Sequence, residues 1–215
     1  RARTTLLGRT MPEPLTLADL AAEGAASHAA LAARPGQARG SVLGPWAENL
    51  NRRYGPDAAA AIRAQLGVDL ATLPDAPLAE QWISGALQIA TTDAIIATHY
   101  ADDLLGLEAP LIEDVGRKVG RMARVMLRGL GPARLLSKAE KLHSYTWDIG
   151  AVSTTVTANS ATLVVHGSPL FTYRTWLALQ LMALRGAVEL TGRTVQSRHV
   201  MRLAEDRAQL YVRWR

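Results

Sequence analysis

The chain has no cysteine among its 215 residues. Disulfides, zinc–thiolate sites, iron–sulfur clusters and thiol catalysis are therefore excluded. Aromatic residues are also few, with five Trp, five Tyr and one Phe, so Ala and Leu must fill most of the interior. Such a composition favours helices over the first two thirds of the chain.

Long apolar runs are missing as well. No stretch approaches the roughly 20 residues that cross a bilayer, and residues 1–10 lack the apolar segment of a secretory signal. We therefore expect a cytoplasmic protein without a transmembrane segment. The net charge of +5 and the pI near 10.0 are modest. Because the excess of Arg over Lys is typical of a high-GC genome, no nucleic-acid partner is expected.

The first 40 residues differ in composition from the rest. They are rich in Ala, Gly, Arg and Pro, and Thr16 with Asp19 forms a helix-start motif. A short helix is predicted over residues 17–33, ended by Arg34-Pro35-Gly36. We interpret residues 1–40 as an N-terminal extension or docking helix. Residues 41–215 are then expected to form a single α+β domain.

Apolar spacing predicts several helices in the middle of the chain. After a brief strand or turn at 41–44, the predicted helices are 45–54, 58–66, 78–105, 111–130 and 133–142. The helix 111–130 is the clearest, because Val115, Val119, Met122, Met126 and Leu130 recur at steps of three and four and are expected to face the core. This core-type spacing argues against insertion of the helix into a membrane.

The period changes to two from Tyr145 onward, which indicates strands. Strands are predicted over 145–149 and 152–157, and then over 161–166, 195–203 and 210–214. Between 161–166 and 195–203 lies the predicted helix 171–190, which is apolar nearly all round, with Arg174, Arg185 and Glu189 expected on a narrow solvent-exposed strip. The predicted fold class is α+β: N-terminal helices, then a β-β-α-β-β module whose small antiparallel sheet is packed by this long helix. Its back must be covered by the upstream helices or by a second copy.

Several short motifs resemble a known family. They are Gly40-Ser41-Val42, the run from Arg52 to Asp57, the small-residue helix leading to Leu130-Gly131-Pro132, and the closing Val212-Arg213-Trp214. Together they resemble an uncharacterised paralogous family expanded in myxobacteria, which is similar to the haem–NO-binding, 4-vinyl-reductase and TRAPP-like ligand-binding fold. The resemblance covers residues 40–215. It implies a domain that senses a small apolar molecule or serves in assembly.

The chain departs from the haem-binding branch of that fold. The branch holds the haem carboxylates with a Tyr-x-Ser-x-Arg motif, whereas the nearest string here is Tyr211-Val212-Arg213-Trp214-Arg215. Arg213 replaces the Ser, so no haem and no other cofactor is expected.

Two groups of residues are candidates for a site. Trp147, Trp176, His199 and Met201 are predicted to line a ligand pocket, with His199 on the apolar side of its strand or as a core imidazole. His99, Asp102 and Asp103 share a face of the predicted helix 78–105, which is the spacing of a weak metal or acid–base site. Asp residues before a Gly loop are more often structural. His143, Ser144 and Asp148 have the residue types of a hydrolase triad but no nucleophile elbow.

A stripe of arginines is the strongest charge feature. Arg117, Arg121, Arg124 and Arg128 recur along one face of the helix 111–130 and suit an acidic partner, although a solvated face is the ordinary interpretation. No reactive constellation appears, so the chain is predicted not to be an enzyme. The favoured hypothesis is an assembly or protein-interaction subunit, with a protein partner or as a homo-oligomer. The alternatives are a sensor of a small apolar ligand and, less favoured, an enzyme or metal site around His99.

Overall fold

The computed structural model describes residues 5–6, 9–10, 12–26, 28–119 and 121–215. Its helical segments are α1 Leu17–Ala21, α2 His28–Ala32, α3 Gly40–Leu43, α4 Trp46–Tyr54, α5 Ala58–Leu66, α6 Gly85–His99, η1 Leu104–Leu107, α7 Glu108–Lys118, α8 Arg121–Leu136, α9 Ala139–Thr146, η2 Pro169–Thr172 and α10 Arg174–Leu190. Its strands are β1 Thr5–Leu6, β2 Arg9–Thr10, β3 Gln37–Arg39, β4 Trp82–Ser84, β5 Ala151–Val156, β6 Ser160–His166, β7 Val195–Ala204 and β8 Arg207–Trp214.

The main sheet has four antiparallel strands in the order β5-β6-β8-β7. Alternate residues of its strands are buried against the helices, as period-two patterning requires. Leu163, Val165, Leu210 and Val212 belong to this inner face. The sheet and the helix between its two hairpins confirm the predicted α+β class with a β-β-α-β-β module.

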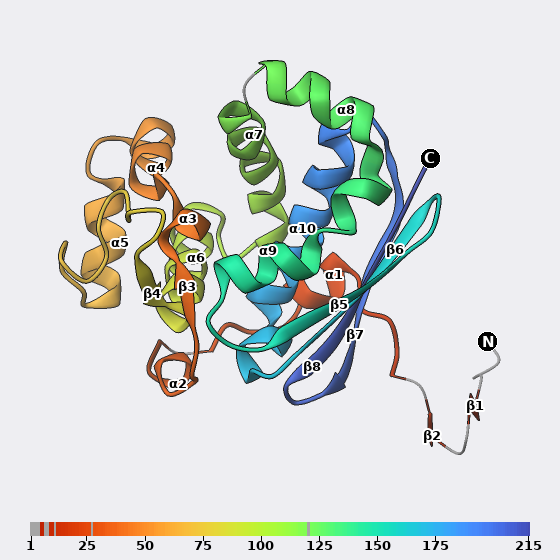
Figure 1. The fold of residues 1–215 in the computed structure, drawn as a ribbon. Coiled ribbons are helices and arrows are strands. Elements are labelled where there is room, and N and C mark those ends of the chain that lie inside the picture. The colour runs from red at the N-terminus through yellow and green to blue at the C-terminus, as the bar shows by residue number, and fades with distance from the viewer. Residues whose placement is uncertain (1–4, 7–8, 11, 27, 120) are drawn as a thin grey trace.

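Helix α10 lies across the inner face of the sheet (Figure 1). Helices α1, α6, α7 and α8 contact its other sides, so the upstream helices cover its back. Arg174 was expected on a wet strip, and that expectation is wrong. Its side chain is buried, where Nη2 lies 3.7 Å from Asp93 and Nη1 donates to the carbonyl of Glu23.

The segment before residue 40 packs on the main core. Leu20 and Leu31 are fully buried there, and Leu15 forms an antiparallel bridge with Val200 at the edge of β7. The single helix predicted over 17–33 is wrong, because α1 ends at Ala21 and α2 begins at His28. The Thr16–Asp19 capping box does start α1. The division of the chain at residue 40 stays a prediction about folding units.

Helix α6 lies between two hydrophobic clusters, which explains why nearly all of its residues are buried. Ile89 and Ile96 belong to the main core, while Leu87 and Ala94 join Trp46 in a smaller cluster with α4 and α5. The predicted helix 78–105 is therefore too long at both ends. At its start the chain forms β4, which pairs with β3. Just after α6 ends, residues 101 and 102 take positive φ angles.

Other boundaries also differ from expectation. Residues 40–43 form α3 rather than a strand or turn, and residues 145–146 belong to α9 rather than to a strand. The predicted helix 111–130 is divided into α7 and α8. The predicted helix 133–142 is shared between α8, which kinks at Gly131 (φ 71°), and α9.

The face expected to bury Met122, Met126 and Leu130 is instead exposed. These side chains are 78%, 66% and 41% accessible. The side chain of Val115 lies outside the described residues. Core-type spacing therefore did not identify the buried side of this region. Within the described part of the chain, none of the helices combines the length and apolarity that a bilayer crossing requires.

Candidate functional site

Two hollows adjoin α10 and α3. The first, here called the sheet pocket, is a cavity of about 260 Å³ between the inner face of the sheet, α9 and α10. Its walls are mostly aliphatic and aromatic, and it is lined by Val42, Leu136, Ala139, Leu142, His143, Thr146, Trp147, Val152, Leu163, Val165, Trp176, Gln180, Ala183, Leu184, Ala187 and Leu210. A mostly apolar wall with few polar groups is typical of small-molecule sites.

Aromatic rings build one end of the sheet pocket. The ring centroids of Trp147 and Trp176 lie 6.4 Å apart, and Phe171 packs edge-on against Trp147 at 5.4 Å. Trp147 comes from the end of α9 and Trp176 from the first turn of α10. The structure thus brings together the two tryptophans that the sequence suggested for a pocket.

His143 is the titratable residue of the sheet pocket. Its Nε2 lies 3.2 Å from the carbonyl oxygen of Ile149, which can only accept, so Nε2 carries the proton of the neutral ring. Burial lowers the pKa of His143, and neutral imidazole is favoured. Nδ1 then has a free lone pair, for which the described residues supply no partner. Ser144 and Asp148 do not contact this ring: Ser144 Oγ donates to the Lys141 carbonyl and Asp148 accepts from Gln37.

His199 and Met201 lie outside the sheet pocket. They sit on the face of β7 opposite to Val200, whose side chain is buried against the helices. His199 stacks on Tyr211 of β8 with ring centroids 4.9 Å apart. The expectation that His199 is on the inner, apolar side of its strand is wrong, and the four predicted pocket residues divide into two pairs on opposite faces.

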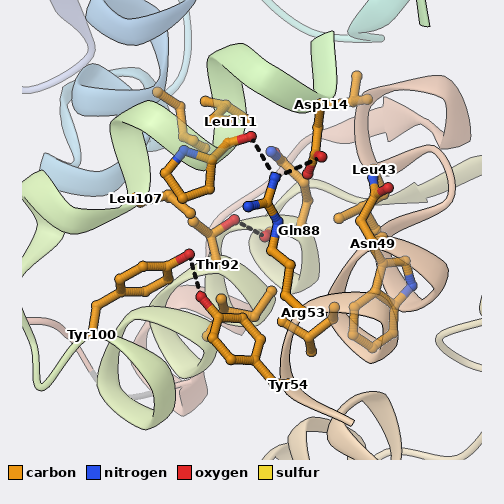
Figure 2. A pocket seen from close by; sticks show the side chains of 16 residues that line it. Leu43, Asn49, Arg53, Tyr54, Gln88, Thr92, Tyr100, Leu107, Leu111 and Asp114 are labelled. Carbon is orange, nitrogen blue, oxygen red and sulfur yellow. Dashed lines mark hydrogen bonds and ion pairs between the residues drawn. The ribbon is translucent and has the colours of Figure 1, made fainter. Parts of the chain in front are cut away.

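The second hollow, here called the helical pocket, is a cavity of about 190 Å³ among α3, α4, α6, α7 and α10. Figure 2 shows its lining, in which apolar side chains such as Leu43 and Leu111 surround a few polar groups. Val42 borders both this cavity and the sheet pocket.

Arg53 extends from α4 into the middle of the helical pocket (Figure 2). Its Nη2 donates to Asp114 at 2.8 Å, to Glu113 at 3.0 Å and to the carbonyl of Pro110 at 3.2 Å. The hydrogen bond from Arg53 lowers the pKa of Glu113. Nε is buried without a partner, and Nη1 donates to none of the described residues.

Gln88 faces Arg53 from α6, and its side-chain amide is unpaired. The residue is 5% exposed, and its Oε1 is buried without a hydrogen-bond partner. None of the described residues forms a hydrogen bond with its Nε2 either. One helical turn on, Thr92 satisfies its own hydroxyl by donating to the backbone carbonyl of Gln88. Buried amides in folded proteins are normally paired, so this one indicates a missing partner.

A tyrosine pair closes one side of the helical pocket, with 2.5 Å between the hydroxyl oxygens of Tyr54 and Tyr100. Burial, together with this hydrogen bond, raises the pKa of Tyr100. His99 stacks on Tyr54 at 4.0 Å between centroids, and its Nε2 is buried and unpaired.

The suggested grouping of His99 with Asp102 and Asp103 is not formed. Helix α6 ends at His99, so the three residues do not share a helical face, and Asp103 instead caps the following turn through Leu105 N. Among the described residues no cluster of three His, Asp or Glu side chains is placed to hold a metal ion.

The arginine stripe is divided between two helices. Arg117 of α7 pairs with Glu113, and Arg124 of α8 donates to the carbonyl of Gly116 at 2.6 Å. Arg128 is exposed on α8, and the side chain of Arg121 is outside the described residues. Arg117 and Arg124 thus each have a partner inside the chain, and an acidic partner for this face stays a prediction.

Sequence reasoning missed Gln88, Arg53 and His143 as pocket residues. A weak signal existed for the first, because Gln88, Thr91 and Asp93 interrupt an otherwise apolar helix. Asp93 proves to be structural. Its carboxylate accepts from Tyr173 at 3.0 Å and from Thr175, near the start of α10. Burial raises its pKa, against these hydrogen bonds.

Comparison with known proteins identifies the fold. No family model and no curated protein matches the chain. Solved H-NOX structures do: the Fe(II) unliganded H-NOX protein from K. algicida aligns with a TM-score of 0.58 at 10% identity, over 82% of this chain and 96% of that chain. An oxygen-binding H-NOX domain related to soluble guanylate cyclases aligns with a TM-score of 0.54 at 10% identity, over 82% and 95%. At such low identity the structural likeness shows the fold alone. It confirms the predicted haem–NO-binding type of fold.

Proposed function

We propose that this chain is a sensor domain that binds a small apolar ligand in the sheet pocket. The observation that carries the proposal is the apolar cavity of about 260 Å³ between the sheet and α10. It is supported by the fold, because the similar H-NOX structures include an oxygen-binding domain. A few polar groups, among them His143 and Gln180, would orient a ligand while the tryptophans provide its contact area.

The residues present do not fit a haem. The sheet pocket is smaller than the ~300–1,000 Å³ typical of drug-sized ligands, and a haem is larger than most of these. Its lining includes no arginine or lysine for the haem carboxylates. The side chains of Val212 and Trp214 are buried in the core, so the alternating Arg213 is on the opposite face of the sheet. We therefore propose a ligand smaller than a tetrapyrrole.

We also propose that the domain is not an enzyme, since neither pocket pairs a nucleophile with a base. Membership of the myxobacterial paralogous family is likewise proposed, on the strength of the short motifs at residues 40–57 and 130–132.

Titration with 1-aminoanthracene, an apolar dye that is brighter in apolar surroundings, tests the sheet pocket. We expect saturable binding to the wild-type chain. Ala183 is exposed at the wall of the pocket, so Ala183→Leu adds bulk there without disturbing the core. It is expected to weaken dye binding by about tenfold or more, because added methylenes do not fit an occupied cavity.

The matched control is Ala60→Leu, the same change at an exposed position of α5. It should leave dye affinity unchanged. Equal dye binding by all three proteins, or no binding by the wild type, would contradict the sheet pocket as the ligand site.

A second candidate function, an assembly or protein-interaction subunit, is favoured by one observation. Met122, Val125, Met126 and Leu130 form an exposed apolar strip on α8. Contiguous apolar surface of this kind often marks an interface between proteins.

A further inference from the structure

The helical pocket contains a glutamine that the chain leaves without hydrogen bonds. Gln88 is almost completely buried, and neither atom of its amide is paired within the described residues. An amide that loses its hydrogen bonds to water on burial and gains none within the protein is unfavourable for folding. The missing partner must therefore come from whatever occupies the cavity, and it must be able to pair with an amide.

Arg53 sets the second requirement. Its Nη2 is fully used by Pro110, Glu113 and Asp114, but its Nε and Nη1 donate to no described residue. Figure 2 shows the guanidinium among the lining side chains of the pocket. A guanidinium only donates, so an occupant of the pocket must offer it an acceptor.

Local charge decides which acceptor is suitable. Asp114 is part of the same wall and pairs with Arg53 at 2.8 Å and with Arg52 at 3.1 Å, while Glu113 pairs with Arg53 at 3.0 Å and with Arg117. The charged residues of the lining, Arg53 and Asp114, therefore balance each other and give no net attraction for an anion, whose transfer from water into an apolar cavity is costly. An uncharged carbonyl oxygen meets the requirement without this cost.

We propose that the helical pocket binds a small, uncharged, largely apolar molecule carrying a primary carboxamide. Its carbonyl oxygen accepts from Arg53, and its amide pairs with that of Gln88, which presents either oxygen or NH₂ by rotation about its last bond. The apolar part lies against Leu43, Trp46, Ile95 and Leu111. A cavity of about 190 Å³ suits a fragment of one ring. This site is separate from the sheet pocket.

Benzamide and benzoate form a matched pair of probes, because they have nearly the same shape and differ in charge. Each is titrated into the full chain at pH 7 and followed by ¹H–¹⁵N NMR, in which Arg53 Nε–H and the Gln88 NH₂ group report directly. We expect benzamide to shift both signals. Benzoate should bind at least about tenfold more weakly, because its charge must leave water for an apolar cavity whose lining charges already balance.

Gln88→Leu tests the role of the glutamine. It should weaken benzamide binding by about tenfold without lowering the melting temperature, because it removes an unpaired polar group. Gln88→Met, an unbranched alternative, serves if the leucine variant does not fold. Gln180→Leu, a matched change in the sheet pocket, should leave benzamide affinity unaltered.

Three outcomes would overturn the proposal. They are no benzamide-induced shift at Arg53 and Gln88, equal affinity for benzoate and benzamide, and unchanged benzamide affinity in a folded Gln88 variant.

Discussion

Gly150 occupies the turn that leads from α9 into β5. Its φ is +74°, a conformation that side chains with a Cβ rarely adopt. A Cβ placed there would lie 2.4 Å from both the carbonyl oxygen of His166 and Cε2 of Phe171. The glycine therefore allows β5 and β6 to close against the ring of Phe171, which packs on the tryptophans of the sheet pocket.

Replacing this glycine should be costly. We expect Gly150→Ala to lower the free energy of unfolding by about 3 kcal/mol, from backbone strain and overpacking together. Urea denaturation followed by circular dichroism measures the change.

Gly129 provides the comparison. It lies inside α8, and no atom is within 4 Å of the position its Cβ would take. Gly129→Ala should raise the free energy of unfolding by about 0.5–1 kcal/mol, because alanine favours the helix. If both variants shift stability by the same amount and sign, the account given for Gly150 is wrong.

At the scale of elements, α1 connects the first part of the chain to the main core. Leu20 is fully buried in the same cluster as α10. Arg202 of β7 also holds this region through a two-pronged ion pair with Glu23, at 2.6 and 2.7 Å. Such contacts make the segment part of the packing around α10.

Leu20→Ala tests whether this segment and residues 41–215 unfold together. We expect a loss of about 2–5 kcal/mol in the free energy of unfolding, as for other fully buried leucines. The measurement is the urea midpoint followed by near-UV circular dichroism of the tryptophans, which lie beyond residue 40.

Leu70→Ala is the control, since Leu70 is 56% exposed, and it should change stability by less than about 0.5 kcal/mol. An unchanged near-UV transition for Leu20→Ala would indicate that residues 1–40 are a separable extension.

The sequence predicted the strands of the main sheet well, because alternation is local and extends over many residues. It did not predict which face of β7 packs against the helices. Arg198 and Arg202 share this inner face with Val200, and their hydrogen bonds to the carbonyls of Leu181 and Thr172 are tertiary contacts. The inner face therefore looked polar, and His199 and Met201 looked like inner-face residues, although Met201 is buried on the outer face.

Short elements were beyond prediction for a related reason. The three residues of β4 are too few to show a period, and their pairing with β3 joins positions more than forty residues apart. The pocket side chains of Gln88 and Arg53 come together only through such packing. The residue types and the family-like run from Arg52 to Asp57 were visible, but their partners were not.

At the scale of the whole molecule, the exposed strip on α8 raises the question of assembly. Met122 and Met126 are among the most exposed large apolar side chains of the described residues. Exposed apolar surface is normally small on a monomer, and burial of the strip against a second copy is one way to remove it from water.

If the chain assembles by pairing two copies through the strip on α8, it should be dimeric in multi-angle light scattering. Met126→Glu should then convert it to a monomer, because the interface would bury an unpaired charge. Leu70→Glu, which changes an exposed residue of another region, should leave the mass unaltered. A wild-type protein that remains monomeric at the highest soluble concentration would rule out the second copy.

Val42 is a shared wall between the two cavities. A guest in one chamber contacts the same side chain as a guest in the other. Any displacement of that valine by one guest therefore changes the volume of the neighbouring cavity. Thermodynamic reciprocity then requires that the first guest changes the affinity for the second by the same factor as the second changes it for the first.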